Sequence, residues 1–381
     1  MAPTPLLLAD LHHSGDHEAA WRLPGSPVDR LADPGYYVEF ARLAADGGFD
    51  AVFFVDFIGF DPVVRSVVRW PFEPTTLTTA VLQSVPDIAA VVTASTVFAT
   101  EDQLHRTFAT LDDLSGGRIG WNIVTTGAPA AARAFGGGAV APHDERYRLA
   151  DGLVADLVAR WTGNGGRGPV RVQAGSSPAG RDFAARHAEV VFTAAPTRDA
   201  AAEFRSDLRR RAERAGRDPD TIRVLPGILT TIGETDDAAR ALRDTLNALI
   251  TEHGARRTLA MYGVELPAGH LDAPLPPIVR DPGFDGIHSR AAVLQSIADD
   301  LGEAPRWRDL VNRIAGSRGH LSVTGSGATI AAVMNDWLDA EACDGFVVKF
   351  AHSPAGARDF VDQVSPLLTA RGIGRGQGWP R

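Results

Sequence analysis

Short, almost wholly apolar runs alternate along this chain with longer amphipathic stretches. Apolar runs of about four to eight residues between turns predict strands buried on both faces, and the amphipathic stretches predict helices. The predicted strands lie at 6–11, 49–55, 88–93, within 115–127, and at 170–174, 189–194, 222–225 and 344–350. Strands alternating with helices form right-handed βαβ units, and eight such units favour a closed α/β TIM barrel over a doubly wound sheet.

Two segments interrupt this alternation. The chain has 381 residues, and we expect residues 1–381 to form a single barrel domain with insertions at about 57–75 and 254–320. Pro226-Gly227 predicts a turn directly after the seventh strand. The glycine-rich tail from Gly372 to Gly378 follows the last predicted helix, and we expect it to be a flexible end.

Polar residues follow the predicted strands, and in a barrel the carboxyl ends of the strands share the rim where chemistry is placed. These residues are His12, His13, His17, Asp56, Thr93, Ser95, Asn122, Ser176 and Ser177. Each has an ordinary alternative, since loop histidines are often solvated and short polar side chains often bond their own backbone. Their convergence on one rim is what favours a site.

The segment from Ser115 to Gly127, SGGRIGWNIVTTG, combines a glycine-entered strand with a polar exit. We expect Asn122, Thr125 and Thr126 at that exit. A buried strand that ends in an ordinary polar loop is the alternative. The roles of Thr125 and Thr126 stay open between substrate contact and turn formation.

Two predicted helix starts could bind phosphate. Gly175-Ser176-Ser177 precedes a helix, where backbone N–H groups and the helix dipole attract anions, although an ordinary serine N-cap is the alternative. The HDERY motif opens another helix and places His143 and Tyr147 on one face. Its alternative is helix capping by Asp144 beside a surface histidine. Together the two starts favour a phosphate-bearing ligand.

Composition and missing motifs exclude other classes of function. The net charge of −9 argues against a nucleic-acid partner. The single cysteine, Cys343, excludes an internal disulfide and fits a cytoplasmic location. No apolar stretch is long enough to span a membrane. No metal site is supported, because HExxH is absent, and the absence of GxSxG argues against a serine hydrolase.

Seven segments, in order, resemble the bacterial-luciferase-like flavin monooxygenases, in the branch of the nitrilotriacetate and dibenzothiophene-sulfone monooxygenases. They are WRLP (21–24), DGGFDAVFFVD (46–56), TAST (93–96), FATLDDLSGGRIGWNIVTT (108–126), HDERY (143–147), VQAGSSPAGRDFAARHAEVVFTA (172–194) and VLPG (224–227). The resemblance extends from about residue 5 to 372. It implies a TIM barrel with insertions and a homo-oligomer, either a dimer or a tetramer. It also implies that reduced FMN from a separate flavin reductase, together with O₂, oxygenates a small organic substrate.

The resemblance also assigns site residues. Asp56 and either Thr93 or Ser95 would contact the isoalloxazine ring, and Asn122 would line its face. The phosphate would be held by His143, Tyr147 and Ser176 or Ser177. His17 matches a position where the family keeps an active-site histidine, so we expect His17 and Asn122 to be catalytic.

Two departures from the family leave the substrate open. The segment between Trp161 and Val170 is shorter than in the family, and residues 254–320 match only loosely. A deazaflavin-dependent oxidoreductase of the same superfamily and a flavin-binding protein without catalysis are the alternatives.

Overall fold

The computed structural model describes residues 4–56, 72–127, 129–135, 138, 140–163, 165–279, 294–295, 297–317, 319–374, 376 and 378–380. Its strands are β1 Leu6–Asp10, β2 Ala51–Phe54, β3 Ala89–Ser95, β4 Ile119–Val124, β5 Val170–Gln173, β6 Val190–Thr193, β7 Arg223–Ile232, β8 Leu321–Gly325 and β9 Gly345–Phe350. Its helices are α1 Pro34–Asp46, α2 Pro74–Ser84, α3 Glu101–Ser115, α4 Pro129–Ala134, α5 His143–Gly163, α6 Pro178–His187, α7 Arg198–Arg214, α8 Asp236–Ala248, α9 Glu252–Ala260, α11 Trp307–Ile314, α12 Gly327–Asp339, α13 Ala355–Gln363 and α14 Ser365–Thr369.

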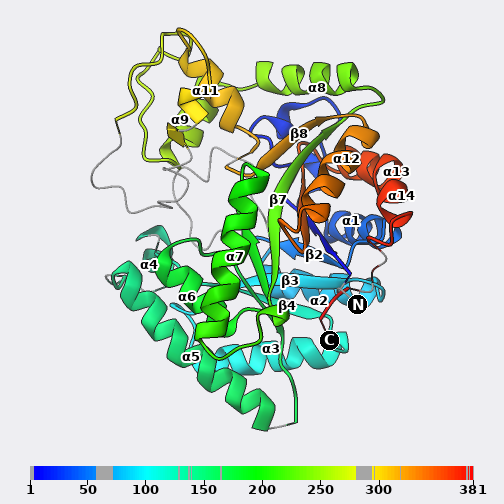
Figure 1. Ribbon diagram of the computed structural model, residues 1–381, viewed down its shortest axis with the longest axis vertical. Coiled ribbons are helices and arrows are strands. Elements are labelled where there is room, and N and C mark those ends of the chain that lie inside the picture. Colours follow the sequence, from blue (N-terminus) through cyan, green and yellow to red (C-terminus); the bar gives the residue numbers. More distant parts are fainter. Residues whose placement is uncertain are drawn as a thin grey trace.

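The strands close into the predicted TIM barrel. Eight parallel strands pair in the ring β1-β2-β3-β4-β5-β6-β7-β9, and β9 pairs back with β1, with helices around the outside (Figure 1). Alternate side chains of the strands fill the lumen, among them Leu8, Phe53, Val91 and Val347. The barrel prediction is therefore confirmed.

The predicted turn at Pro226-Gly227 is wrong, because β7 continues through both residues to Ile232. Its first half pairs with β6, and its second half pairs on that same edge with β8, a strand that the sequence pattern did not predict. A Cβ on Gly227 would lie 2.6 Å from the His320 ring. The glycine therefore permits a close approach inside a strand rather than a turn.

The expectation of a flexible tail is also wrong. Gly376 N–H donates to the Gly48 carbonyl at 3.1 Å, and Gly378 N–H donates to Asp50 Oδ1 at 2.7 Å. Trp379 is 8% exposed and packs with the lumen side chains at the amino end of the barrel, where a Cβ on Gly120 would come within 2.9 Å of it. The tail closes that end of the barrel, and its glycines supply backbone turns with positive φ.

The two expected insertions differ in how much of them is described. Residues 57–71 lie outside the described residues, and α2 begins at Pro74 behind the capping side chain of Glu73. In the other segment, α9 and α11 share a separate hydrophobic cluster around Tyr262 and Trp307. In the view of Figure 1 this part lies far from the two chain ends.

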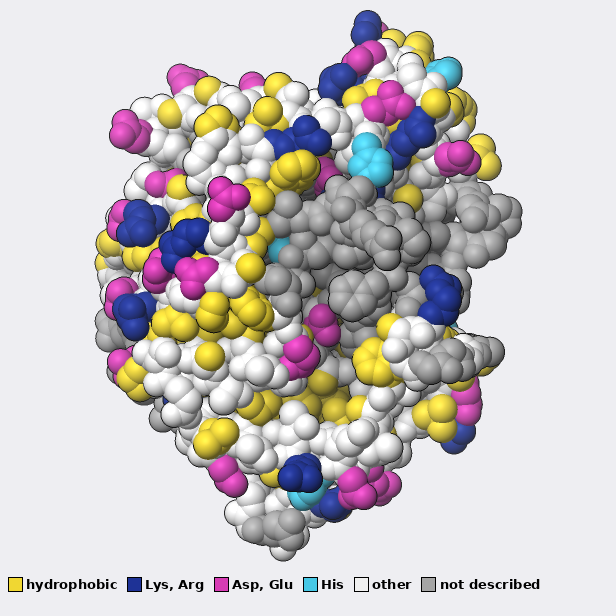
Figure 2. All heavy atoms as spheres, turned by 180° about the vertical axis from the view of Figure 1, so that it is seen from behind, with side chains coloured by type: hydrophobic (Ala, Val, Ile, Leu, Met, Phe, Trp, Pro, Cys, Tyr) yellow, Lys and Arg dark blue, Asp and Glu magenta, His cyan; other side chains and the backbone are white. Residues whose placement is uncertain are grey.

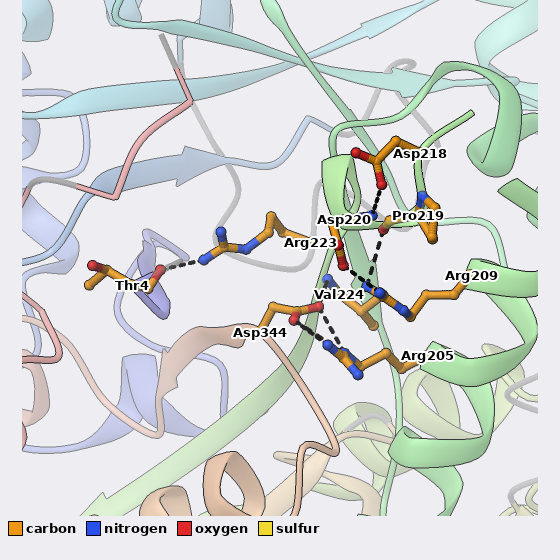
Figure 3. A network of polar contacts seen from close by, with 9 residues as sticks. All are labelled: Thr4, Arg205, Arg209, Asp218, Pro219, Asp220, Arg223, Val224 and Asp344. Atoms are coloured by element: carbon orange, nitrogen blue, oxygen red, sulfur yellow. Dashed lines mark hydrogen bonds and ion pairs between the residues drawn. The ribbon is translucent and has the colours of Figure 1, made fainter. Parts of the chain in front are cut away.

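Ion pairs tie the amino ends of the strands together (Figure 3). Arg205 of α7 binds Asp344, with Nη2 2.9 Å from Oδ1, and Asp344 Oδ2 accepts from the Val224 amide at 2.8 Å. Elsewhere, acidic and basic side chains are interspersed on the described part of the face seen in Figure 2. Within the described residues, no helix is long and apolar enough to cross a membrane.

Candidate functional site

A chain of hydrogen bonds crosses the carboxyl side of the lumen. Asn122 Nδ2 donates to Thr93 Oγ1 at 2.9 Å, and Thr93 Oγ1 donates to the Phe54 carbonyl at 3.0 Å. Asn122 Oδ1 is buried and has no hydrogen-bond partner among the described residues. A buried acceptor without a partner is costly unless a ligand or water donates to it, so this atom is a candidate contact for a ligand in the lumen.

The sequence suggested that Asn122 lies at the strand exit, but it lies inside the strand. It is the fourth of the six residues of β4, and its side chain faces the lumen because strand side chains alternate. Ser95, the last residue of β3, accepts from the Val97 amide at 3.2 Å and so bonds local backbone, as its ordinary alternative implied. Asp56 is partly buried two residues after β2.

The loop after β1 brings three buried histidines to the rim: His12, His13 and His17. The solvated alternative does not hold for them. The Ala19 amide donates to His17 Nδ1 at 3.2 Å. In a neutral imidazole the proton therefore lies on Nε2, which donates to Asn247 Oδ1 at 3.1 Å. Asn247 belongs to α8, so His17 links the loop to the segment that follows β7.

Beneath this loop lie three buried charges that the sequence reading missed. Lys349 of β9 contacts Asp10 Oδ2 at the end of β1, and its Nζ lies 3.1 Å from Asp16 Oδ1. The three side chains are 6%, 0% and 1% exposed, in the order Lys349, Asp10, Asp16. Burial lowers the pKa of Lys349 to about 7, while the carboxylates favour its charged form. The signal in the sequence was a lysine inside the apolar run FVVKF.

The two helix starts predicted to bind phosphate do come together. Ser177 Oγ lies 3.3 Å from His143 Nε2, and the rings of His143 and Tyr147 are 5.0 Å apart. Tyr147 also contacts Thr125 and Ser177, and burial raises its pKa. Ser177 accepts from the Gly180 amide at 3.1 Å, so it caps α6 as well. Ser176 lies directly before it, and its carbonyl accepts from Arg181.

Backbone and side chains approach each other closely in this cradle. A Cβ on Gly175 would lie 2.3 Å from Gln173 Nε2 and 2.5 Å from Tyr147 Oη. Only glycine fits at position 175. Because glycine has no side chain, the turn is not blocked on the side that faces the start of α6. A helix N-terminus with hydroxyl and imidazole groups around it suits a phosphate group. The residues present therefore fit a phosphate-bearing ligand.

A cavity of about 520 Å³ lies beside the rim, between α8, α11 and β8. It is lined in part by Arg243, Asn247, Asn312, Arg313 and His320. Asn247 bonds His17, and the His320 ring stacks on Phe192 of β6 with centroids 5.0 Å apart. The cavity thus adjoins the barrel mouth. The sequence did not predict this cavity, because α11 falls within the expected insertion at 254–320 and β8 was not predicted as a strand.

Comparisons with known proteins agree with the barrel fold. The sequence profile of the luciferase-like monooxygenases matches residues 12–275. An N-acetyl-S-(2-succino)cysteine monooxygenase from Bacillus subtilis is 34% identical, over 95% of this chain and 91% of that protein. Component A of the nitrilotriacetate monooxygenase from Aminobacter aminovorans is 31% identical, also over 95% and 91%. The solved structure of an EDTA monooxygenase from Chelativorans superposes with a TM-score of 0.83 at 28% identity, over 99% of this chain and 96% of that one.

Proposed function

This chain belongs to the luciferase-like monooxygenase family, and we propose that it is the FMN-dependent oxygenase component of a two-component system. In such a system a separate flavin reductase supplies reduced FMN, and one oxygen atom of O₂ enters a small organic substrate. The observation that carries the proposal is that the same barrel has both an acceptor without a partner among the described residues, Asn122 Oδ1, and the cradle at Ser177. Thr125, just beyond β4, contacts Tyr147 of the cradle and so connects the two.

In this proposal one group of residues binds the phosphate of FMN and another contacts its ring. Ser177, Tyr147 and His143 would hold the phosphate at the start of α6. Asn122 Oδ1 would accept a hydrogen bond from a ring N–H, and Thr93 fixes the orientation of the Asn122 amide. Reduced FMN, when bound, supplies the electrons that activate O₂. His17 has a fixed tautomer and would hold a proton close to the reaction, and Asp56 and Ser95 complete the proposed rim.

The wider organisation is proposed on the same basis. We propose that residues 1–381 form a single barrel domain with insertions at about 57–75 and 254–320, and that the protein is a cytoplasmic dimer or tetramer. The lone cysteine, Cys343, is buried, and burial raises the pKa of its thiol to about 12, which favours the neutral thiol over the thiolate.

Oxygen consumption by the purified chain tests the activity. With reduced FMN delivered by a reductase and with candidate substrates supplied, we expect O₂ uptake coupled to an oxygenated product, and no turnover with NAD(P)H alone. Hydride transfer from a reduced deazaflavin without O₂ uptake would identify an oxidoreductase instead. Flavin binding without any product from a broad substrate panel would favour a binding protein without catalysis.

A further inference from the structure

Lys349 joins three parts of the chain that are separate in sequence. Its ammonium group, on β9, meets one carboxylate from the end of β1 and one from the following loop. Asp10 and Lys349 are neighbours across the β1–β9 pair, where Ala9 lies opposite Val348. Asp16 reaches the same point from the loop, so the three groups share one buried position at the carboxyl side of the lumen.

The loop lies directly on the chain that follows Lys349. The Asp16 amide donates to the Phe350 carbonyl at 2.8 Å, and the His17 amide donates to the Ala351 carbonyl at 3.1 Å. A Cβ on Gly15 would lie 2.4 Å from His352 Cα, so only glycine permits this approach. The position of His17 therefore depends on the contact between the loop and the chain after β9, and the ion pair between Lys349 and Asp16 strengthens that contact.

The charge balance makes this contact depend on the ammonium group. Two carboxylates that are almost fully buried share the Lys349 ammonium group, and its loss would leave their buried negative charge less well compensated. Without Lys349, Asp10 and Asp16 would repel each other in a medium of low dielectric constant. Asp10 is held in a barrel strand, whereas Asp16 belongs to the loop, so we expect relief to come from displacement of Asp16 and of His17 beside it.

We propose that Lys349 is a positioning residue, which holds His17 at the barrel rim by binding Asp16 against β9. This inference rests on the proposed function for its effect on catalysis. Its effect on the loop concerns the chain without any ligand. The phosphate cradle and Asn122 belong to other strands and loops, so flavin binding should not depend on Lys349.

Amide hydrogen exchange of the ligand-free chain tests the positioning directly. In Lys349→Met we expect the amides of Asp16 and His17 to exchange at least about tenfold faster than in the wild type. Adding Asp16→Asn should restore slow exchange to within about threefold, because the side-chain amide that this substitution introduces can donate to the Asp10 carboxylate. If removing the Asp16 charge restores slow exchange, Lys349 acts by neutralising the carboxylates and not by packing alone.

Arg205→Met is the matched control. It breaks another largely buried ion pair, with Asp344 at the opposite end of the barrel (Figure 3). It should lower the melting temperature but leave exchange in residues 11–20 unchanged. If Lys349→Met does not fold, Asp16→Ala replaces it. That variant keeps the Lys349–Asp10 pair, cuts only the link to the loop, and should show the same fast exchange.

Kinetics extend the test to the reaction. Lys349→Met should bind reduced FMN within about twofold of the wild-type affinity, while product formed per O₂ consumed falls at least about tenfold. Unchanged exchange and unchanged coupling in this variant would overturn the proposal, as would equally fast exchange in Lys349→Met and the double variant. If the wild type binds no reduced FMN, the proposed function fails, while the exchange data still decide the role of Lys349 in the loop.

Discussion

Asn122 and Ser177 are the two side chains on which the proposed flavin site most depends. The amide nitrogen of Asn122 donates to Thr93, and its oxygen has no hydrogen-bond partner in the described part of the chain. Ser177 caps α6 and lies beside His143. The first would recognise the ring and the second the phosphate. Each role can therefore be removed separately.

Asn122→Leu should weaken binding of reduced FMN by about tenfold, because one hydrogen bond in a buried site contributes about 1–1.5 kcal/mol. Anaerobic fluorescence titration measures the affinity. Asn335→Leu is the control, since Asn335 Oδ1 is also buried without a partner among the residues that the structure describes, but lies on the outer helix α12. Equal affinity in wild type and Asn122→Leu would remove Asn122 from the site.

Ser177→Ala should weaken FMN binding by about tenfold and leave riboflavin binding unchanged, because only FMN carries the phosphate. Thr197→Ala removes the corresponding N-cap of α7, where Thr197 accepts from the Ala200 amide, and should affect neither ligand. Titration of each variant with both flavins gives the comparison. Equal losses for FMN and riboflavin would show that Ser177 acts only through the helix.

Several of these residues could be found from the sequence, because they follow apolar strands or open helices. The contacts between them could not. That Asn122 bonds Thr93 depends on the β3–β4 register, which pairs the two residues. Lys349 and Asp10 meet only because the barrel closes between β9 and β1. Closure is a property of the whole ring, and no local pattern reveals it.

At the scale of elements, the helices on the outside of the barrel are held by shared ion pairs. Asp207 of α7 accepts from Arg181 of α6 at 2.9 Å and from Arg211, one turn along its own helix, at 2.9 Å. Burial opposes ionisation of Asp207, but the hydrogen bonds from the two arginines outweigh it and hold the pKa of Asp207 below its ordinary value. This carboxylate ties α7 to α6, and the start of α6 is where we propose that the phosphate binds.

Asp207→Asn should lower the free energy of unfolding by about 1–2 kcal/mol at pH 7. A carboxylate with a lowered pKa in the folded state stabilises the fold above its unfolded pKa of about 3.9, and this stabilisation is lost as the pH falls through the folded value. The difference between wild type and variant should therefore shrink below about pH 4. Urea denaturation at several pH values tests this, with the exposed Asp156→Asn of α5 as a neutral control.

The elements themselves were predictable where they are long or wholly apolar. All eight ring strands were predicted, although β7 continues well beyond its predicted end. β8 was not predicted because its sequence, LSVTG, is short and mixes polar with apolar residues. Its side chains are only partly buried. It forms a strand because the second half of β7 extends past β6, which leaves an edge of β7 with which β8 pairs. Tertiary pairing here overrides a weak local preference.

For the whole molecule, the tail seals the amino end of the barrel with Trp379. The opposite end stays available for chemistry, as in other barrels of this type. The glycines around Trp379 suggested flexibility in the sequence, but they let the backbone turn tightly enough to bring the indole under the lumen. Composition alone did not distinguish these two uses of glycine.

Trp379→Ala should destabilise the protein by about 3–5 kcal/mol, because it leaves a cavity in the lumen. Affinity for reduced FMN should stay unchanged, since the phosphate cradle and Asn122 lie toward the other end of the barrel. Chemical denaturation measures the loss, and Trp379→Phe should recover most of it. A variant as stable as the wild type would show that the tail does not seal the barrel in solution.

A crystal structure of the chain with bound FMN would show whether the flavin occupies this site. We expect the phosphate within hydrogen-bonding distance of Ser177 and Tyr147 at the start of α6. We also expect a ring N–H to donate to Asn122 Oδ1. A phosphate bound elsewhere on the rim, or a ring that leaves Asn122 Oδ1 without a partner, would contradict the proposed site.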